Sequence, residues 1–116
     1  AGNWAIIADD PEKEAAAVGE YALYQTNQYV SWGAFGPPDQ VPLFPDAATA
    51  IQEGFYELWD ADQAVAALTD ILKTYPEIVD VHFWAQFPGE SIDSGSRRME
   101  YIAKQVLPRV RANIDA

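Results

Sequence analysis

Apolar residues recur along the chain with two different periods, which predict strands separated by helices. Trp4 to Ala8 is a short apolar run that stops at Asp9-Asp10-Pro11, and its length favours a buried strand over about residues 4–8. From Val79 to Phe87 apolar and polar residues alternate, as on a strand with one buried face, and Pro88-Gly89 ends the run. We therefore expect a strand near each end of the chain, over about residues 4–8 and 79–87.

The first helix is predicted by its start signals. Asp10 is a suitable N-cap, and Pro11 fits the first helical position because its missing N–H has no partner there. The apolar pattern extends this helix over about residues 11–31.

Two further helices are predicted in the second half of the chain. Asp60 and Gln63 have the spacing of a capping box, and the apolar stripe behind them predicts a helix over about residues 61–74. After the Pro-Gly turn, apolar residues at three- and four-residue steps predict a helix over about residues 96–111.

Between the first two helices lies a stretch with no regular period. Residues 33–45 hold four prolines and two glycines, which predicts an irregular loop, either packed against the surface or acting as a lid. Asp46 is placed to cap a short helix through Ile51. Phe55 to Trp59 is a second dense apolar and aromatic stretch, to which we assign no element.

Strands separated by helices predict an α/β protein of parallel βα units, in a single domain over residues 1–116. Two strands do not make a stable sheet alone. The apolar run of the first strand also begins only four residues into the chain. We therefore expect either a piece of a longer protein or a sheet completed by another chain.

The composition of the chain excludes several classes of function. The chain has 49% hydrophobic residues and a net charge of -11, so it is expected to fold, and to be repelled by nucleic acid and by anionic membrane surfaces. It contains no cysteine and one histidine, which excludes disulfides, thiolate sites and a multi-histidine metal site within one chain. No apolar run approaches the roughly 20 residues that span a bilayer, and no signal segment opens the chain, so the default expectation is a cytoplasmic protein.

Several segments resemble the carboxy-terminal end of the bacterial-luciferase-like, flavin-dependent monooxygenases. Phe83 to Ser91 (Phe-Trp-Ala-Gln-Phe-Pro-Gly-Glu-Ser), residues 94–101 and Val106 to Val110 resemble the last barrel strand of that family and the following helix with its Val-Leu-Pro end. Ile6 to Glu12 resembles the penultimate strand and its cap, and Asp60 to Val65 resembles the start of the helix that leads into the last strand.

The resemblance implies the last βα units of a (β/α)8 TIM barrel. It also implies an oxidoreductase that acts on a small organic substrate with O₂, using FMN or the deazaflavin F420. The homo-oligomer is expected from the small number of strands and the apolar loop, and not from the resemblance. In the family, much of the flavin-phosphate apparatus lies on earlier strands. The chain has no Gly-rich phosphate loop, because Gly33 to Gly36 runs into a proline pair and not into a helix. We therefore expect this chain to be inactive alone.

On barrel geometry, the active site lies at the carboxyl ends of the strands. This placement gives a set of candidate pocket residues, some on the last strand and some in the turn and helix after it: His82, Trp84, Gln86, Glu90, Ser91 and Arg97. Trp84 would form an apolar wall and Gln86 would supply a hydrogen bond.

Each candidate has a structural alternative. His82 also fits a hydrogen-bonded interior histidine, and Trp84 and Gln86 also fit ordinary barrel filling. Glu90 is placed to pair with Arg97 or Arg98 across the turn, and as an exposed pair it would contribute only about 0–1 kcal/mol. The two arginines lie near a helix start, where they would alternatively contact an anionic cofactor group.

Asp9 and Asp10, after the first strand, are better explained as helix caps than as catalytic acids. At the level of the whole chain, the alternative to the enzyme is a non-catalytic α/β module that self-associates. The sequence leaves the substrate, the choice between the two flavins and the oligomeric state open.

Overall fold

The protein is a mixed α/β chain that is mostly helical. The computed structural model describes residues 4–53, 56–82 and 86–115. In chain order the elements are β1 (Trp4–Ile7), α1 (Pro11–Ser31), α2 (Ala47–Gln52), β2 (Tyr56–Trp59), α3 (Ala61–Thr74), α4 (Ile92–Tyr101), the π-helical segment η1 (Ile102–Val106) and α5 (Leu107–Asp115). None of the helices in this part of the chain has both the length and the apolar character to cross a bilayer.

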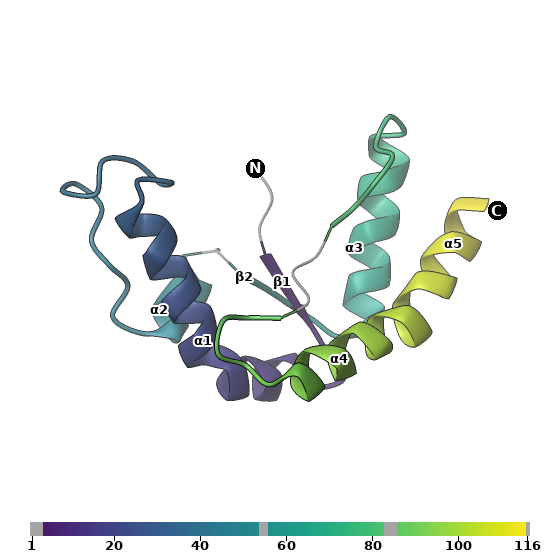
Figure 1. The fold of residues 1–116 in the computed structure, drawn as a ribbon. Helices are drawn as coiled ribbons and strands as arrows, with labels where there is room; N and C mark the ends of the chain where they lie inside the picture. The colour runs from purple at the N-terminus through teal and green to yellow at the C-terminus, as the bar shows by residue number, and fades with distance from the viewer. Residues whose placement is uncertain (1–3, 54–55, 83–85, 116) are drawn as a thin grey trace.

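A small parallel sheet lies at the centre of the described residues, between two groups of helices (Figure 1). β1 and β2 pair in the register Trp4 with Tyr56 through Ile7 with Trp59, and the N–H of Ala8 donates to the Trp59 carbonyl at 3.0 Å. Since α1 joins two parallel neighbours, the expectation of parallel βα units is confirmed for this pair.

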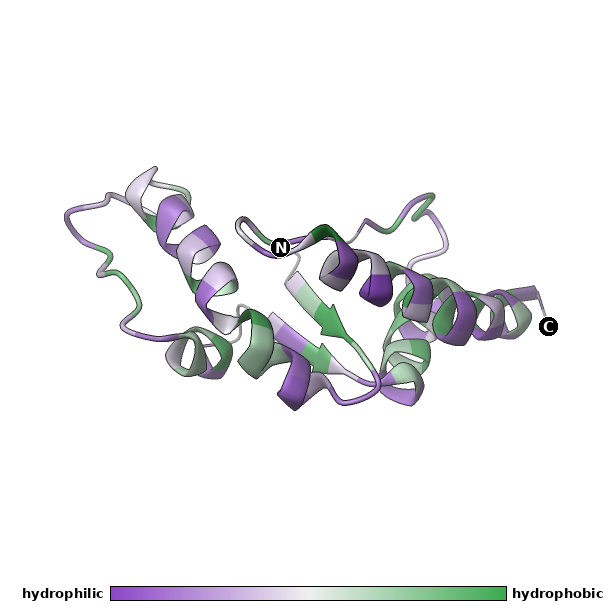
Figure 2. Ribbon diagram, turned by 60° about the horizontal axis from the view of Figure 1, so that its bottom comes forward, coloured by the Kyte–Doolittle hydropathy of each residue, from purple (hydrophilic) through white to green (hydrophobic). Residues whose placement is uncertain are grey.

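Alternate strand residues pack on different helices, so helices cover both faces of the sheet. On one face, the buried cluster joins the strands to α1, α2 and the turn at Phe87: Ile6, Ala15, Val18, Ala22, Ala50, Tyr56 and Phe87. On the other face, the buried cluster joins β1 to α3, η1 and α5: Ile7, Ala64, Val65, Leu68, Val106 and Val110. Figure 2 shows hydrophobic residues on the strands and on the sides of the helices that face them.

Helix starts follow the signals in the sequence. Asp10 accepts a hydrogen bond from the backbone N–H of Lys13 at 3.2 Å, and α1 has the predicted bounds 11–31. Asp60 and Gln63 form the predicted capping box at the start of α3, whose bounds are also those predicted. Asp46 caps the predicted short helix α2. These aspartates are therefore helix caps.

The strand prediction over residues 79–87 is wrong in its described part. Residues 79–82 and 86–87 belong to no helix or strand, and the rest of the range lies outside the described residues. The second strand is instead β2, in the aromatic stretch to which no element was assigned. The last helix also begins earlier than predicted, at Ile92, because Ser91 caps it through the N–H of Ser94 at 3.2 Å.

From α4 the chain continues through η1 into α5 as one helix with a wide turn. Pro108 lies two residues beyond η1, and in a regular helix its ring would clash with the carbonyl of Lys104. η1, the wide turn, lies at the position where this clash would occur.

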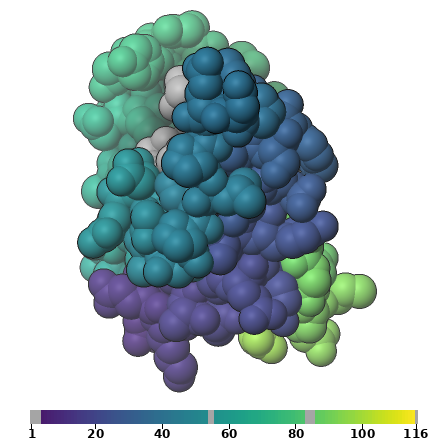
Figure 3. Space-filling view, turned by 90° about the vertical axis from the view of Figure 1, so that its left-hand side faces the viewer, coloured from purple at the N-terminus to yellow at the C-terminus, as the bar shows by residue number. Residues whose placement is uncertain are grey.

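The predicted irregular loop over residues 33–45 contains no helix or strand. Asn27 of α1 fixes its end, because the amide donates to the Phe44 carbonyl at 3.1 Å and accepts from the Phe44 N–H at 2.8 Å. With α2, the loop forms much of the face that Figure 3 shows in blue and teal.

Candidate functional site

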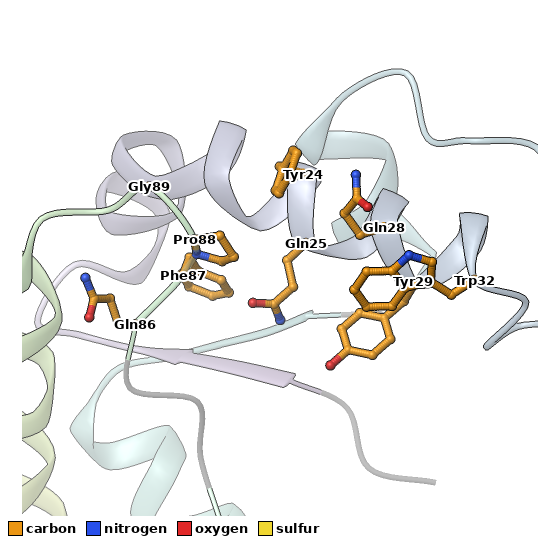
Figure 4. A pocket seen from close by; sticks show the side chains of 9 residues that line it. All are labelled: Tyr24, Gln25, Gln28, Tyr29, Trp32, Gln86, Phe87, Pro88 and Gly89. Atoms are coloured by element: carbon orange, nitrogen blue, oxygen red, sulfur yellow. The ribbon is translucent and has the colours of Figure 1, made fainter.

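A hollow of about 530 Å³ lies between the carboxy-terminal half of α1 and the turn at residues 86–89 (Figure 4). The wall from α1 consists of Tyr24, Gln25, Gln28, Tyr29 and Trp32. The opposite wall is the turn, with Phe87 and Pro88 beside Gln25 in the view. No lining residue carries a charge. Apolar walls with a few amide groups are typical of small-molecule sites.

Aromatic rings connect the two walls beneath the hollow. Phe87 and Tyr56 have ring centroids 6.0 Å apart, Tyr56 and Trp4 5.3 Å, Trp4 and Tyr29 5.4 Å, and Tyr29 and Trp32 5.5 Å. All four pairs are tilted or edge-on, the arrangements that aromatic rings prefer. Because Trp4 begins β1, the hollow lies toward the amino-terminal end of the sheet.

Gln25 brings a polar group into this aromatic site. Its side chain points into the hollow between the turn and Tyr29 (Figure 4), and the residue is only 7% exposed. Its amide nitrogen, Nε2, has no hydrogen-bond partner among the described residues. A buried donor left unpaired costs about 1–3 kcal/mol, a cost that a bound hydrogen-bond acceptor would remove.

Gly89 brings the turn against α1. Its φ is +89°, a conformation that side chains with a Cβ rarely adopt. A Cβ at this position would also lie 3.0 Å from Cδ1 of Tyr21. Glycine is therefore required here both for the backbone conformation and for the close approach of the turn to the tyrosine ring.

A buried ion pair fixes the end of the turn to α4. Nη2 of Arg98 donates to Oε2 of Glu90 at 2.7 Å, and Nη1 donates to Oε1 of Glu90 and to Oε1 of Glu14 in α1, the latter at 2.8 Å. The N–H of Phe87 donates to Oε2 of Glu90 at 2.9 Å, and the hydroxyl of Ser94 donates to Oε1. Glu90 and Arg98 are each 6% exposed.

The electrostatics of this network favour the charged carboxylate. Burial by itself raises the pKa of Glu90, but the hydrogen bonds from Arg98, Ser94 and the Phe87 N–H outweigh burial, and the pKa lies below its ordinary value. The guanidinium carbon of Arg98 also lies 5.5 Å from the centroid of the Phe87 ring. The network therefore joins α1, the turn and α4.

The pKa of Tyr56 is also altered by its surroundings. Burial raises its pKa to about 12, although the hydrogen bond with Thr26 acts in the opposite direction. The hydroxyl donates to the Ala22 carbonyl at 2.8 Å and lies 2.5 Å from Oγ1 of Thr26. Tyr56 is therefore a neutral structural group that ties β2 to α1.

The five predicted pocket residues that the structure describes do not form one site. Of these five, only Gln86 lines the hollow, and in Figure 4 it lies away from Gln25, with its amide donating to the Glu90 carbonyl at 2.7 Å. His82 and Arg97 are exposed, so His82 is not an interior residue.

The other three candidates have different outcomes. Ser91 is an exposed helix cap. Glu90 pairs with Arg98, the second of the two arginines considered, and the expectation of an exposed pair is wrong because both residues are buried. Trp84 lies outside the described residues.

Sequence reasoning missed the residue that gives the hollow its polarity. Gln25 lies in the middle of α1 and carries no motif, so its role depends on which helix face the turn covers. Among the described residues, no group of three or more His, Cys, Asp or Glu side chains is placed to hold a metal ion. In comparisons with known proteins, no family model, curated protein or solved structure matches this chain.

Proposed function

We propose that this chain is the carboxy-terminal part of a luciferase-like, flavin-dependent oxidoreductase that acts on a small organic substrate with O₂. One observation supports the proposal most. The turn Phe87–Glu90 is a built element, held against α1 by Gly89 and joined to α4 by the buried Glu90–Arg98 pair. These residues belong to the segment that carries the family resemblance. The ion pair explains the glutamate at the end of the Phe-Pro-Gly-Glu sequence, because this residue fixes the turn to α4.

The described residues do not fit the phosphate of a flavin. The carboxyl ends of β1 and β2 lead into Asp9, Asp10 and Asp60, whose carboxylates would repel a phosphate. Arg98 is engaged with two carboxylates, and Arg97 is exposed on α4. In the proposed enzyme, this chain positions the turn and the helix behind it, and another part of the protein holds the cofactor phosphate.

The placement of the helices defines a condition for the proposal. A TIM barrel keeps its helices on the outer side of the sheet, whereas α1 and α3 here lie on different faces of the β1–β2 pair. Joining this chain to a barrel therefore requires α3 and α5 to leave the face that they cover. Such a barrel would also add strands to both edges of the pair.

Flavin binding tests the proposal directly. The chain is mixed with FMN or with riboflavin, and its mass by light scattering and its absorption spectrum are recorded on the same chromatographic peak. We expect a flavin band with both compounds at similar occupancy, because the described residues offer no site for the phosphate and binding would come from contacts with the flavin ring. A colourless peak with both flavins would contradict the proposal.

A second candidate function is a self-associating α/β module without catalysis. It is favoured by the two-stranded sheet of the described residues, since a pair of strands gains stability when another chain extends it. A colourless dimer or larger oligomer in the same experiment would support this module. A colourless monomer would exclude both candidates.

A further inference from the structure

We propose that the hollow between α1 and the turn at residues 86–89 is a binding site for a neutral, planar aromatic molecule that carries a hydrogen-bond acceptor, such as a ring carbonyl. This inference is independent of the proposed oxidoreductase function. The hollow lies toward the amino-terminal end of β1, whereas the active site of a barrel enzyme lies at the carboxyl ends of the strands.

The acceptor is inferred from Gln25. Its Nε2 group is buried, points into the hollow and has no partner among the described residues. A carbonyl oxygen or a ring nitrogen of a bound molecule would accept this hydrogen bond. Nε2 would then have a hydrogen-bond partner in the complex and none among the described residues without it, which is the pattern of a recognition group.

The planar ring is inferred from the walls. Trp32 is 69% exposed and Tyr24 is 57% exposed, so two large aromatic side chains present their surface to solvent beside the hollow. Tyr29 lies between Gln25 and Trp32 along α1, and Phe87 lies on the turn beside Gln25 (Figure 4). The exposed rings of Trp32 and Tyr24 are therefore the surfaces on which a flat molecule can stack.

Neutrality is inferred from charge. No charged residue lines the hollow, and the chain has a net charge of -11. An anionic ligand would lose its hydration without gaining a cationic partner, and it would also be repelled over a longer range. A neutral ligand meets neither cost.

The probe is 7-amino-4-methylcoumarin, a neutral two-ring molecule with a lactone carbonyl. Its binding to the intact chain is measured by fluorescence anisotropy and by energy transfer from tryptophan. Two comparison molecules test the inferred chemistry: 2-aminonaphthalene, which has the two rings without a carbonyl, and 7-amino-4-methylcoumarin-3-acetate, which adds a negative charge. We expect saturable binding of the probe and at least about fivefold weaker binding of both comparison molecules.

Gln25→Met tests the hydrogen bond, because methionine has nearly the shape of glutamine and no donor. We expect the dissociation constant of the coumarin to rise by roughly fivefold to tenfold, as for the loss of one hydrogen bond. We also expect the urea midpoint of the free protein to stay equal or to rise, because an unpaired donor is removed. Gln105→Met is the matched control: Gln105 is exposed in η1, outside the hollow, and should leave binding unchanged.

A second variant, Trp32→Leu, tests stacking at an exposed position, where folding is not at risk. We expect it to weaken binding of the coumarin and of 2-aminonaphthalene together. The proposal is overturned if the coumarin does not bind, if Gln25→Met leaves its affinity unchanged, or if Gln25→Met lowers the urea midpoint clearly, which would mean that Gln25 already has a structural partner. Flavin binding that survives Gln25→Met would belong to the proposed oxidoreductase site, so the two proposals can fail separately.

Discussion

Arg98→Met is the most informative perturbation of the fold, because Arg98 is the cation that neutralises two carboxylates. The substitution keeps much of the side-chain stem and leaves Glu90 buried with hydrogen bonds only from Ser94 and the Phe87 N–H. Removing one partner of a buried pair costs about 3–5 kcal/mol, since the remaining charge is uncompensated. The loss should therefore be a large fraction of the stability of a small domain, about 5–15 kcal/mol.

The stability difference between the native protein and Arg98→Met should depend on pH, and the pKa of Glu90 determines the direction of this dependence. In the native protein the pKa of Glu90 is lowered, so the carboxylate contributes stability above its unfolded pKa of about 4.5 and loses it as pH falls through the folded value. In Arg98→Met, burial raises the pKa of the same carboxyl. As pH falls, protonation of Glu90 removes the uncompensated buried charge and with it the loss of stability. The difference in stability between the two proteins should therefore shrink below about pH 5.

Urea unfolding followed by circular dichroism, at pH 7 and at pH 4, measures both effects. Glu14→Gln is the graded control: Glu14 contacts only one nitrogen of Arg98 and its side chain is 26% exposed, so we expect a loss of about 1 kcal/mol. Arg97→Met, at the exposed neighbouring position, should change stability by less than about 0.5 kcal/mol. The reasoning is refuted if the Arg98 and Arg97 variants lose similar stability, or if the Arg98 effect is independent of pH.

Three further predictions concern single positions. Gly89→Ala should cost about 1–3 kcal/mol in urea unfolding, because the positive φ and the contact with Tyr21 both oppose a Cβ, and a neutral result would place the turn elsewhere. The raised pKa of Tyr56 contributes stability that is complete below pH 10 and lost as pH rises toward 12, up to about 3 kcal/mol, so Tyr56→Phe should be less sensitive than the native protein to alkaline unfolding. Asp60→Ala should cost about 1 kcal/mol by removing the capping box with Gln63, whereas Asp60→Asn should retain most of that stability.

The helix bounds could be predicted because their signals are local. Asp10 with Pro11, and Asp60 with Gln63, satisfy the first backbone N–H groups within one turn, so the sequence nearby determines where each helix begins. The strands could not be predicted in the same way. β2 has four residues, too few to show a period, whereas the longer alternating segment 79–87 joins no sheet in its described part.

The site depended on contacts between distant residues, which explains why the sequence indicated only part of it. Glu90 and Arg98 lie eight positions apart, and their burial results from Phe87 and α1 covering them. Gln25 lies about sixty residues before the turn that forms the other wall of its hollow. No periodicity or motif indicates such a contact.

The wide turn η1 has a consequence for how this helix can change in sequence. Arg98 and Val106 are both buried and lie eight residues apart, which in a regular α-helix would separate them by about 80° around the axis. A π-turn absorbs one residue, and the remaining seven steps bring the two side chains within about 20°. Replacing Pro108 by alanine alone would remove the reason for the wide turn, and deleting one residue of η1 alone would shorten the helix by one step. Either change would rotate Arg98 relative to Val106 by about 100° around the helix axis, so that one of them leaves its partners. The two changes made together would restore the alignment, so the proline and the length of this helix form a compensating pair.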